Sequence, residues 1–393
     1  EAVCLGAPEA SDSYLNIDRI IRSAKELGVD AIHPGYGFLA ENAAMADACE
    51  RNDIVFIGPT ALSMKAVASK QHARQLVDSL SLPTIPGLNR LVSYSDEFVA
   101  QCEAIGFPVL LKATAGGGGV GMRIVEHGDD LQAAFEAVSR ESQQAFGDGG
   151  IIVEKYLANA RHLEVQVLAD HYGHCVHLHE RDCSIQRRRQ KIVEESPARL
   201  LPAGIKQSLC DTAVAIAKHI NYRGAGTVEF LYSPEHQQFY FLEMNTRLQV
   251  EHGVTELVTG IDIVQWQLRL AEGEALTLAQ ANIPQNGHAI ECRICAENPS
   301  KGFIPAIGTI EYWAAPKYQR CDSGVQSGDR ISIYYDSLVA KVIACGNDFF
   351  EANRNLQTAL NQSVLLGVDN NLPYLRKLIS SDSWRGGGLD TQA

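Results

Sequence analysis

The chain has 393 residues, of which 46% are hydrophobic and 21% are charged, and its formal net charge at pH 7 is −13. This composition excludes an intrinsically disordered protein, and the negative charge argues against a general attraction to nucleic acid. The length predicts two or three domains, and no apolar run is long enough to span a membrane. The ten cysteines follow no disulfide framework, so we expect reduced thiols in a cytoplasm-like compartment.

The first third of the chain alternates between helix and strand patterns. Helical spacing of apolar residues predicts helices at 14–28, 41–52 and 60–80. Short apolar runs predict strands at 30–34 and 54–59. This alternation is typical of a parallel sheet covered by helices. Two strands are few for an independent sheet, so we expect a further N-terminal segment to precede Glu1.

Beyond residue 107 the pattern changes to strands joined by turns. The predicted strands are 107–114, 122–126, 151–157, 161–170, 175–182, 226–232, 237–245, 288–297 and 331–344. The predicted helices in this part are 203–220, 350–362 and 372–379. The whole chain is therefore predicted to be α+β with an α/β N-terminal part.

The segment LLKATAGGGGVGM places Lys112 directly before a run of glycines. Gly116, Gly118 and Gly121 match G-x-G-x-x-G, but a dinucleotide fingerprint opens a helix, whereas a predicted strand follows this loop. A Walker A loop is excluded because Met122 stands where its lysine belongs. Strand, glycine loop and strand are typical of a flap whose backbone N–H groups close over phosphates. The alternative is a mobile hairpin turn.

A row of polar residues alternates along FYFLEMNTRLQVEH. Its members, spaced two apart, are Glu243, Asn245, Arg247, Gln249 and Glu251. In an extended chain they would project from one face, with Glu251 too far from Glu243 to share a metal ion. Carboxylate, amide and guanidinium groups hold metals and anions and move protons, whereas the alternative is a solvated strand face. We favour the functional interpretation.

The neighbouring predicted strand carries a second carboxylate. If 226–232 and 237–245 form a hairpin centred on His236, Glu229 lies directly across from Glu243. A shift of one residue would put the two side chains on opposite faces. Two facing carboxylates with an amide nearby suit Mg²⁺ held against nucleotide phosphates.

Further motifs accompany the glycine-rich flap: VEKYL, ERDCSIQRRRQKIVEESPA, TVEFLY, FLEMNTRLQVEHGVTE and AIECRICAEN. Together they resemble the biotin carboxylase branch of the ATP-grasp enzymes over essentially the whole chain. GVDNNLPYLRKLI is most similar to the α subunits of acyl-CoA carboxylases. The resemblance implies a truncated Rossmann-like N-terminal domain at 1–58, an ATP-grasp domain at 59–272 and a biotin carboxylase C-terminal domain at 273–393. The flap lobe would occupy about 84–157.

The resemblance also implies an activity. A ligase of this kind forms a C–N bond: ATP phosphorylates bicarbonate to carboxyphosphate, and the carboxyl group passes to N1 of biotin. This is the first half-reaction of an acyl-CoA carboxylase, and it requires ATP with Mg²⁺ or Mn²⁺. No AMKM attachment motif is present, so biotin would be a substrate on a separate carrier protein or domain. The other implied partners are a carboxyltransferase subunit and further copies of the chain, in the cytoplasm or a mitochondrial matrix.

The resemblance assigns roles to individual residues. Those assigned to ATP are Lys70, Lys112, Gly116, Gly117, Gly118, Gly119, Gly121, Glu154, Leu157, His162 and Gln186. Those assigned to metal ions are Glu229, Glu243 and Asn245. Those assigned to catalysis are Lys191, Arg247, Glu251 and Arg293. Those assigned to bicarbonate or biotin are Arg247, Gln249, the Val250 backbone and Arg293. In this scheme Glu251 deprotonates bicarbonate and Arg293 stabilises the enolate-like biotin anion.

The sequence departs from the family pattern at two positions. Val120 stands where the flap usually has arginine, and Arg189 stands where the family usually has histidine. Arginine keeps its proton near neutral pH, so an acid–base role at that position would be lost. Two other function classes stay open: another ATP-grasp ligase joining a carboxylate to an amine, and a nucleotide-binding relic without turnover. Bicarbonate-dependent ATP hydrolysis stimulated by free biotin distinguishes them.

Four other patterns receive a structural or local interpretation. DHYGHCVHLHERDC concentrates histidine and cysteine, but its spacing matches no recognised zinc pattern. Cys292 and Cys295 would point to opposite faces of a strand, which favours packing. RRRQK in an acidic chain favours a local anion pocket over a nucleic-acid patch. His33, in HPGYGFLAEN, is interpreted as part of a tight polar turn without chemistry.

Overall fold

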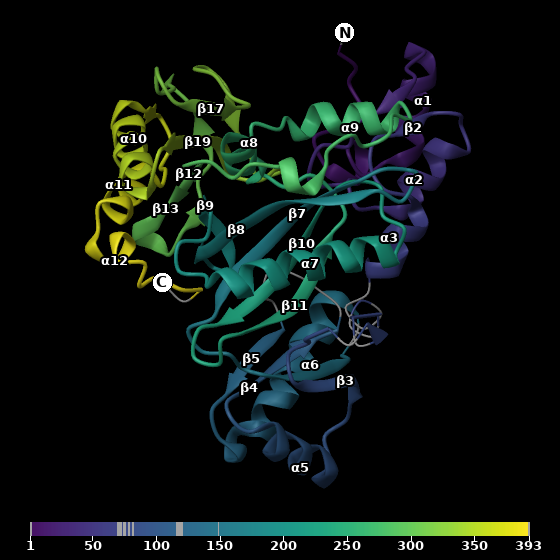
Figure 1. The fold of residues 1–393 in the computed structure, drawn as a ribbon, viewed down its shortest axis with the longest axis vertical. Coiled ribbons are helices and arrows are strands. Elements are labelled where there is room, and N and C mark those ends of the chain that lie inside the picture. Colours follow the sequence, from purple (N-terminus) through teal and green to yellow (C-terminus); the bar gives the residue numbers. More distant parts are fainter. Residues whose placement is uncertain are drawn as a thin grey trace.

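The fold consists of one large central sheet with a smaller part at each side and a lobe at one end. The computed structural model describes residues 2–68, 73, 76–77, 79–80, 82–114, 121–147 and 149–391. In Figure 1 the purple N-terminal part and the yellow C-terminal helices lie on opposite sides of the teal central strands, and a blue lobe extends beyond them. Within these ranges, no helix combines the length and apolarity needed to cross a membrane.

The N-terminal part packs helices around two short parallel strands, as the alternating pattern predicts. Its elements are α1 (Ile17–Leu27), β1 (Ala31–Ile32), α2 (Ala43–Glu50), β2 (Val55–Phe56) and α3 (Ala61–Ala68). Asn16 and Asn42 begin α1 and α2 by accepting a backbone N–H three residues on. Gly28 ends α1 in the left-handed conformation. α3 forms the start of the helix predicted at 60–80, and Lys70 lies outside the described residues.

A four-stranded antiparallel sheet, in the order β3-β6-β4-β5, forms the lobe. The elements of the lobe are β3 (Gly87–Val92), α5 (Asp96–Ile105), β4 (Val109–Ala113), β5 (Met122–Val125), α6 (Leu131–Phe146) and β6 (Ile151–Lys155). β4 and β5 pair with Lys112 opposite Met122, which confirms strand, loop and strand around the glycines. Gly116–Gly119 and Val120 themselves lie outside the described residues. The lobe packs a separate apolar core around Leu111.

The central sheet has eight strands in the order β11-β10-β7-β8-β9-β12-β19-β17. Its strands are β7 (Arg161–Ala169), β8 (Cys175–Arg187), β9 (Gln190–Ser196), β10 (Gly224–Ser233), β11 (Gln238–Asn245), β12 (His288–Cys295), β17 (Arg320–Ser323) and β19 (Leu338–Gly346). α7 (Ala203–His219) covers one face, and α8 (His252–Thr259) and α9 (Ile263–Ala271) cover the other. Because β9 pairs with β12, the sheet continues without a break into the C-terminal part.

The C-terminal part packs helices against β12 and β19. Its further elements are β13 (Glu297–Asn298), β14 (Ile304–Pro305), β15 (Gly308–Thr309), β16 (Tyr312–Ala314), β18 (Arg330–Ile331), α10 (Phe349–Gln362), β20 (Val364–Leu366), α11 (Leu372–Ile379) and α12 (Asp382–Arg385). The single strand predicted at 331–344 is wrong, because β18 ends at Ile331 and β19 begins at Leu338. Asp336 accepts the N–H of Leu338 and so turns the chain between them.

The hairpin of β10 and β11 confirms the predicted pairing of Glu229 with Glu243. The turn itself pairs Ser233 with Gln238, which is half a residue away from a hairpin centred on His236. A β-bulge beside Glu229 shifts the register by one residue and brings the two carboxylates opposite each other. The predicted pairing of Glu229 with Glu243 is therefore correct, but it depends on a β-bulge that was not predicted from sequence.

Candidate active site

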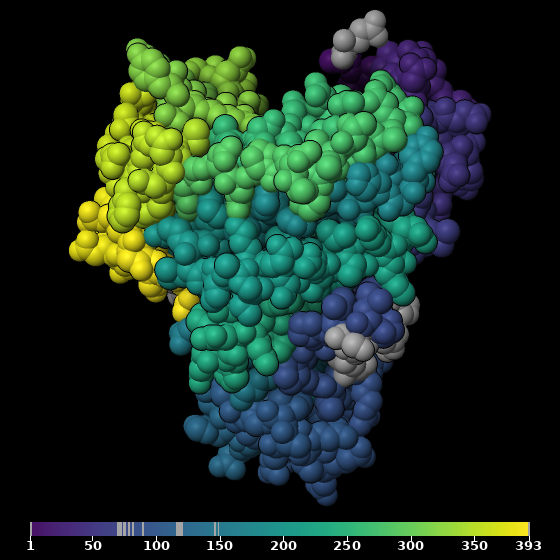
Figure 2. All heavy atoms as spheres, viewed as in Figure 1, coloured from purple at the N-terminus to yellow at the C-terminus, as the bar shows by residue number. Residues whose placement is uncertain are grey.

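The predicted site residues gather in one pocket of about 1380 Å³ between the lobe, the central sheet and the C-terminal part. Those that line it are Lys112, Glu154, His162, Gln186, Lys191, Glu229, Glu243, Asn245, Arg247, Gln249, Val250, Glu251 and Arg293. Gly121 and Leu157 lie in the lobe and at its edge without lining the pocket. Figure 2 shows the C-terminal part and the N-terminal part standing apart on either side of the central body.

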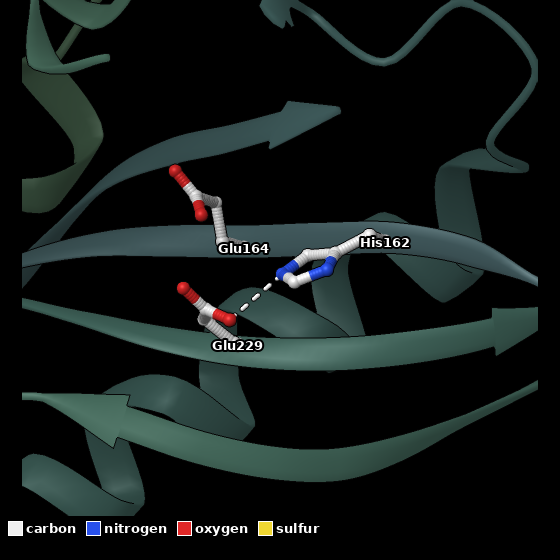
Figure 3. Close-up of side chains that lie close together, drawn as sticks. All are labelled: His162, Glu164 and Glu229. Atoms are coloured by element: carbon white, nitrogen blue, oxygen red, sulfur yellow. Dashed lines mark ion pairs between the residues drawn. The ribbon is translucent and has the colours of Figure 1, made fainter. Parts of the chain in front are cut away.

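The floor of the pocket is a row of acidic residues on neighbouring strands. His162 and Glu164 project from the same face of β7, and Glu229 projects beside them from β10 (Figure 3). Glu229 is the register partner of both Glu164 and Glu243. The His162 Nε2 atom lies 2.8 Å from Glu229 Oε2. Glu164 was not predicted, although a buried strand that alternates histidine, glutamate and glutamine on one face could have indicated it.

Lys191, on β9, lies at the centre of this charge cluster. Its Nζ atom lies 2.5 Å from Glu164 Oε2, 2.7 Å from Glu229 Oε1 and 2.8 Å from Glu251 Oε1. Burial alone would lower the pKa of Lys191, but the three carboxylates outweigh it and raise that pKa well above its usual value. Burial alone would raise the pKa of Glu229 and of Glu251, but Lys191 and further cations hold both well below their usual range. Lys191, Glu229 and Glu251 are therefore ionised at neutral pH.

Glu229, Glu243 and Asn245 supply oxygen atoms of the kind that hard divalent cations prefer. Glu229 Oε1 accepts hydrogen bonds from Asn245 Nδ2 at 2.8 Å and from Gln249 Nε2 at 2.9 Å. Asn245 Oδ1 lies 3.5 Å from Arg247 Nη2. A half-turn of this amide would direct its oxygen toward the two facing carboxylates. The donor set therefore fits Mg²⁺ or Mn²⁺.

The polar row from Glu243 to Glu251 does not lie on a single strand. β11 ends at Asn245, and the following residues form an irregular connection that reaches α8. The predicted separation of Glu251 from Glu243 stays a prediction, whereas Glu251 and Glu229 both contact Lys191. The chain folds back after β11 instead of continuing straight. Alternation of residue types therefore identified the site, but an extended strand was the wrong geometry for it.

Arg293, on β12, reaches the cluster from the C-terminal part. Its Nε donates to Glu194 Oε1 at 2.6 Å, and its Nη2 donates to Glu251 Oε2 at 2.9 Å. Burial would lower the pKa of Arg293, but Glu194 and Glu251 raise it, so the guanidinium stays charged. Glu251 is thus held between Lys191 and Arg293. The sequence analysis missed Glu194 because it missed β9, whose apolar alternation is short and follows a run of polar residues.

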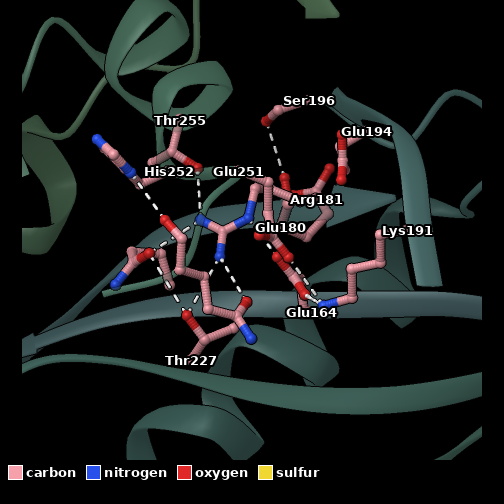
Figure 4. A network of polar contacts seen from close by, with 12 residues as sticks. Glu164, Glu180, Arg181, Lys191, Glu194, Ser196, Thr227, Glu251, His252 and Thr255 are labelled. Carbon is pink, nitrogen blue, oxygen red and sulfur yellow. Dashed lines mark hydrogen bonds and ion pairs between the residues drawn. The ribbon is translucent and has the colours of Figure 1, made fainter. Parts of the chain in front are cut away.

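Arg181 is fully buried and lies beside the charge cluster. It pairs with Glu164 and donates to Gln166 Oε1 at 2.9 Å and to Thr255 Oγ1 at 3.0 Å. Figure 4 shows this guanidinium surrounded by oxygen atoms from the sheet and from α8. Arg181 also acts on Glu251, where it helps to lower the pKa of that carboxyl. Sequence reasoning did not single it out.

Two further residues position the connection that follows β11. Glu41 accepts Arg247 Nε at 2.8 Å and the backbone N–H of Thr246 at 2.9 Å. Lys341, on β19, donates to the Val250 carbonyl at 2.5 Å. Glu41 belongs to the HPGYGFLAEN segment, to which no chemistry was assigned. Neither residue carries a spacing signal, because each reaches the site from a distant part of the chain.

The opposite end of the pocket is formed by the lobe. Lys112 is buried and pairs with Glu154 across β4 and β6. Gln186 Nε2 lies 3.0 Å from His162 Nδ1. Arg189, which departs from the family pattern, lines the pocket with Nη1 at 3.1 Å from Met122 Sδ. The basic run around it therefore faces the pocket.

His33 and the histidines of DHYGHCVHLHERDC do not line the pocket, whereas Tyr36, Gly37 and Phe38 of the HPGYGFLAEN segment and Cys295 do. His179 Nε2 lies 3.2 Å from the carbonyl of Ile283, and burial lowers the pKa of its neighbour His177 to about 4. His33 accepts the N–H of Gly35 at 3.0 Å within a turn, as interpreted from sequence. Both histidine motifs thus bond to the backbone.

Comparison with known families gives three matches along the chain. The model described as "Biotin carboxylase, N-terminal domain" matches residues 1–64. "Carbamoyl-phosphate synthase L chain, ATP binding domain" matches residues 69–279. "Biotin carboxylase C-terminal domain" matches residues 291–393. The three matches cover most of the chain and include every part that lines the pocket.

Individual relatives agree with the family matches. Biotin carboxylase 1 of Bacillus subtilis is 45% identical across 100% of this chain and 88% of its own length. The α subunit of methylcrotonoyl-CoA carboxylase of Dictyostelium discoideum is 44% identical, but the chain spans only 56% of it. A solved structure of biotin carboxylase from Campylobacter jejuni, a β-γ-ATP complex, has a TM-score of 0.94 and 42% identity, covering 99% of this chain and 87% of that one.

A second solved structure is the biotin carboxylase domain dimer of the Hydrogenobacter thermophilus 2-oxoglutarate carboxylase, in complex with MgADP, ADP and bicarbonate. Its TM-score is 0.93 with 43% identity, and the match covers 99% of this chain and 86% of that one. At this level of identity the likeness extends beyond the general fold to the sequence of the chain as a whole.

Proposed function

Because this chain belongs to the biotin carboxylase family of ATP-grasp enzymes, we infer that it is a C–N ligase that carboxylates biotin with ATP and bicarbonate, and we propose roles for its pocket residues. The observation that supports these roles best is the double pairing of Glu251 with Lys191 and Arg293. It sets one carboxylate apart from Glu229 and Glu243. A base and a metal-binding pair have different tasks, and two kinds of carboxylate supply them.

We propose that the lobe side of the pocket binds the nucleotide. Lys112 is positioned to bind phosphate oxygens, while Glu154 and Leu157 border the adenine and His162 and Gln186 lie beside the nucleotide. Lys70 and the glycines Gly116–Gly119 and Gly121 would complete this site. A divalent cation held by Glu229, Glu243 and Asn245 would neutralise charge on the phosphates when it is bound.

Bicarbonate would lie between Arg247, Gln249 and the Val250 backbone. Glu251 takes its proton while a bicarbonate oxygen attacks the γ-phosphorus, so that ADP leaves and carboxyphosphate forms. In the resting cluster Lys191 lowers the proton affinity of Glu251. Once phosphate oxygens bind Lys191, its hold on Glu251 weakens and the carboxylate becomes a stronger base. Nucleotide binding would thus prepare the base for its task.

The biotin ring would lie on the Arg293 side. Arg293 is charged and partly buried and donates one hydrogen bond to each of two carboxylates, so its position is well defined. Negative charge develops on the ureido group as N1 takes the carboxyl group from carboxyphosphate and phosphate leaves. A guanidinium held in place beforehand stabilises this charge without reorganisation.

We propose that the chain is organised as domains 1–58, 59–272 and 273–393, which the ranges of the family matches support. Its proposed partners are a biotin carrier protein or domain, a carboxyltransferase subunit and a second copy of the chain. The α subunits of acyl-CoA carboxylases among its relatives and a biotin carboxylase dimer among its structural neighbours support these partners. Either the cytoplasm or a mitochondrial matrix would suit it.

The test is phosphate release by the purified chain with ATP and Mg²⁺. We expect release to depend on bicarbonate and to rise further with free biotin, and we expect carboxybiotin among the products. ATP binding without release under any of these conditions would support a nucleotide-binding relic instead. Release stimulated by a carboxylate and an amine, but not by bicarbonate, would support a different ligase.

A further inference from the structure

Glu291 is a buried carboxylate behind the proposed biotin side of the pocket. It lies on β12, two residues before Arg293, and none of its side chain is exposed. Neither of its carboxylate oxygens has a hydrogen-bond partner among the residues that the structure describes. An isolated carboxylate without water or a donor is expensive to keep ionised, so such a group takes up a proton instead.

The nearest carboxylate to Glu291 is Glu194. The two residues are direct register partners on β12 and β9, so their side chains leave the sheet on the same face. Glu194 Oε1 accepts Arg293 Nε, whereas Glu194 Oε2 has no partner among the described residues. Two carboxylates so placed repel each other when both are ionised. One proton held by the pair removes this repulsion.

Nearby cations already have partners of their own. The charged and titratable groups that surround Glu291 from β9, β12, β17, β19 and α8 are Glu194, Arg293, Arg320, Asp322, Lys341, Glu251, His252 and Glu256. Arg320 pairs with Glu256 at 2.6 Å, and Lys341 Nζ lies 3.4 Å from Asp322. Burial lowers the pKa of His252 to about 4, with a contribution from Lys341, so this imidazole is neutral. No cation in this set pairs with Glu291.

α8 closes the space around Glu291. A Cβ atom at Gly253 would lie 3.4 Å from Glu291 Oε2 and 2.2 Å from Ile343 Cδ1, so the helix backbone lies directly against the carboxyl group. Val254 and Val258 of α8 pack with Ala289 and Ile343 beside it. This side is formed by the helix backbone and apolar side chains, with the Arg320 guanidinium carbon 3.6 Å from the same Cβ position, and no described residue donates a hydrogen bond to the carboxyl group.

We propose that Glu291 is a positioning residue for the carboxylation step: it stays protonated at neutral pH, so that Glu194 and Glu291 carry a single negative charge and Arg293 remains directed toward Glu251 and biotin. An ionised Glu291 would attract the same guanidinium away from the pocket. This inference rests on the proposed role of Arg293. Burial, with nearby carboxylates, raises the pKa of Glu291 to about 8, in agreement with the geometry.

The first test measures protonation without using activity. Because the folded protein holds the Glu291 proton more tightly than the unfolded chain does, stability is lost as pH rises from the ordinary pKa near 4.5 toward about 8, and no further loss follows above that. In Glu291→Gln a neutral amide replaces the neutral acid. We expect the thermal midpoint of this variant, relative to that of the parent at the same pH, to increase between pH 6 and 9 by an amount on the order of 2 °C.

Glu180→Gln is the matched control, because Glu180 is equally buried but is fully engaged. It accepts the Ala198 N–H at 3.1 Å and pairs with Lys206 at 3.1 Å. We expect this variant to lose stability at every pH and to keep the parental pH dependence. Should Glu291→Gln fold poorly, Glu291→Met, which is apolar and of similar length, must give the same flattened dependence.

The second test follows the carboxylation of free biotin from pH 6.5 to 9. In the parent, kcat/KM for biotin is expected to fall about tenfold in the pH unit above the Glu291 transition, while KM for ATP stays constant. In Glu291→Gln we expect no such fall of kcat/KM for biotin between pH 6.5 and 9. A variant that keeps the parental alkaline fall, or that follows the parental thermal midpoint at every pH, overturns the proposal. The thermal test also distinguishes this failure from a failure of the proposed function, because it needs no turnover.

Discussion

At the scale of single residues, the carboxylates of the site differ in the partners that each one contacts. Glu251 contacts Lys191 and Arg293, Glu229 contacts Lys191 and His162, and Glu291 has no hydrogen-bond partner among the described residues. All of them are buried. Burial therefore does not decide which of them is ionised, and the arrangement of cations does.

Replacing Glu251 with glutamine tests the proposed base. Glu251→Gln keeps the shape of the side chain and can still accept a hydrogen bond from Arg293, but it cannot take a proton. We expect bicarbonate-dependent phosphate release to fall by about two to four powers of ten, with nucleotide affinity within a few-fold of the parent. Turnover close to that of the parent would show that Glu251 is not the base, and loss of ATP binding would place it in the nucleotide site.

Replacing Glu243 tests the proposed metal site. Glu243→Gln removes one of two facing negative charges, so the Mg²⁺ concentration needed for half-maximal phosphate release should rise by about tenfold or more. Glu41→Gln, which changes a carboxylate that contacts Arg247 instead, is the control and should leave the Mg²⁺ requirement unchanged. Identical Mg²⁺ titrations for Glu243→Gln and the parent would contradict the metal role.

Residue types and spacing allowed much of the site to be predicted from sequence. Glu229 and Glu243 could be paired because a hairpin imposes a register. The alternation along β7 could have indicated Glu164, but Glu194 and Glu41 could not be predicted in this way, because they enter the site from another strand and from the N-terminal part. Such residues become visible only when distant segments are brought together, and local periodicity contains no information about that.

At the scale of the elements, the position of α8 is constrained by its close packing on the sheet. It begins at His252, directly after Glu251, and its backbone at Gly253 lies against Ile343 of β19. A glycine at this position permits a close approach of helix and sheet that any side chain would prevent. The conformation of Glu251 therefore depends on packing several residues away from the charge cluster.

Gly253→Ala should destabilise the protein. The new Cβ atom would lie 2.2 Å from Ile343 Cδ1, and both positions are buried, so the Ile343 side chain must leave its packed rotamer or the helix must shift, at a cost of about 1–3 kcal/mol. Gly204→Ala in α7 is the matched control, since a Cβ atom there meets nothing within 4 Å and should stabilise the helix by about 0.5 kcal/mol. Thermal unfolding of the two variants measures the difference; equal midpoints would contradict the close packing of α8.

The element pattern was predicted well where apolar alternation was long. β7, β10 and β12 lie close to the ranges predicted for them. β9 was missed because its seven residues follow QRRR, and the strand predicted at 331–344 was broken by the turn at Asp336. Short strands depend on their neighbours in the sheet more than on their own sequence, so single-sequence patterns identify them poorly.

At the scale of the whole molecule, the central sheet joins parts of the chain that the family matches describe as separate domains. β9 of the nucleotide-binding part pairs with β12 of the C-terminal part, and Arg199 stacks over Phe349 and Trp384 across the same boundary. The lobe, in contrast, has a sheet and a core of its own. The central sheet therefore joins the ATP-binding and C-terminal parts into one unit, whereas the lobe packs as a separate unit, so the molecule is not divided into three equal domains.

Hydrogen exchange should distinguish the continuous central sheet from the separately packed lobe. Backbone amides of β7, β10, β12 and β19 are expected to exchange through openings of similar free energy, because one ladder of hydrogen bonds joins them. Amides of β4 and β6 are expected to exchange faster, by about tenfold or more, because the lobe can open separately. Exchange from β12 and β19 at the faster rate of the lobe, with β7 and β10 still protected, would contradict a single cooperative sheet.

The continuous sheet has a consequence for the order in which the protein is made. Arg293 follows Glu251 by 42 residues, so at about 5–20 residues per second the ribosome adds it roughly 2–8 s later. During that interval the nascent chain carries the carboxylates but lacks the guanidinium that pairs with two of them. The arrangement that holds Glu251 between Lys191 and Arg293 therefore cannot form until β12 has been synthesised.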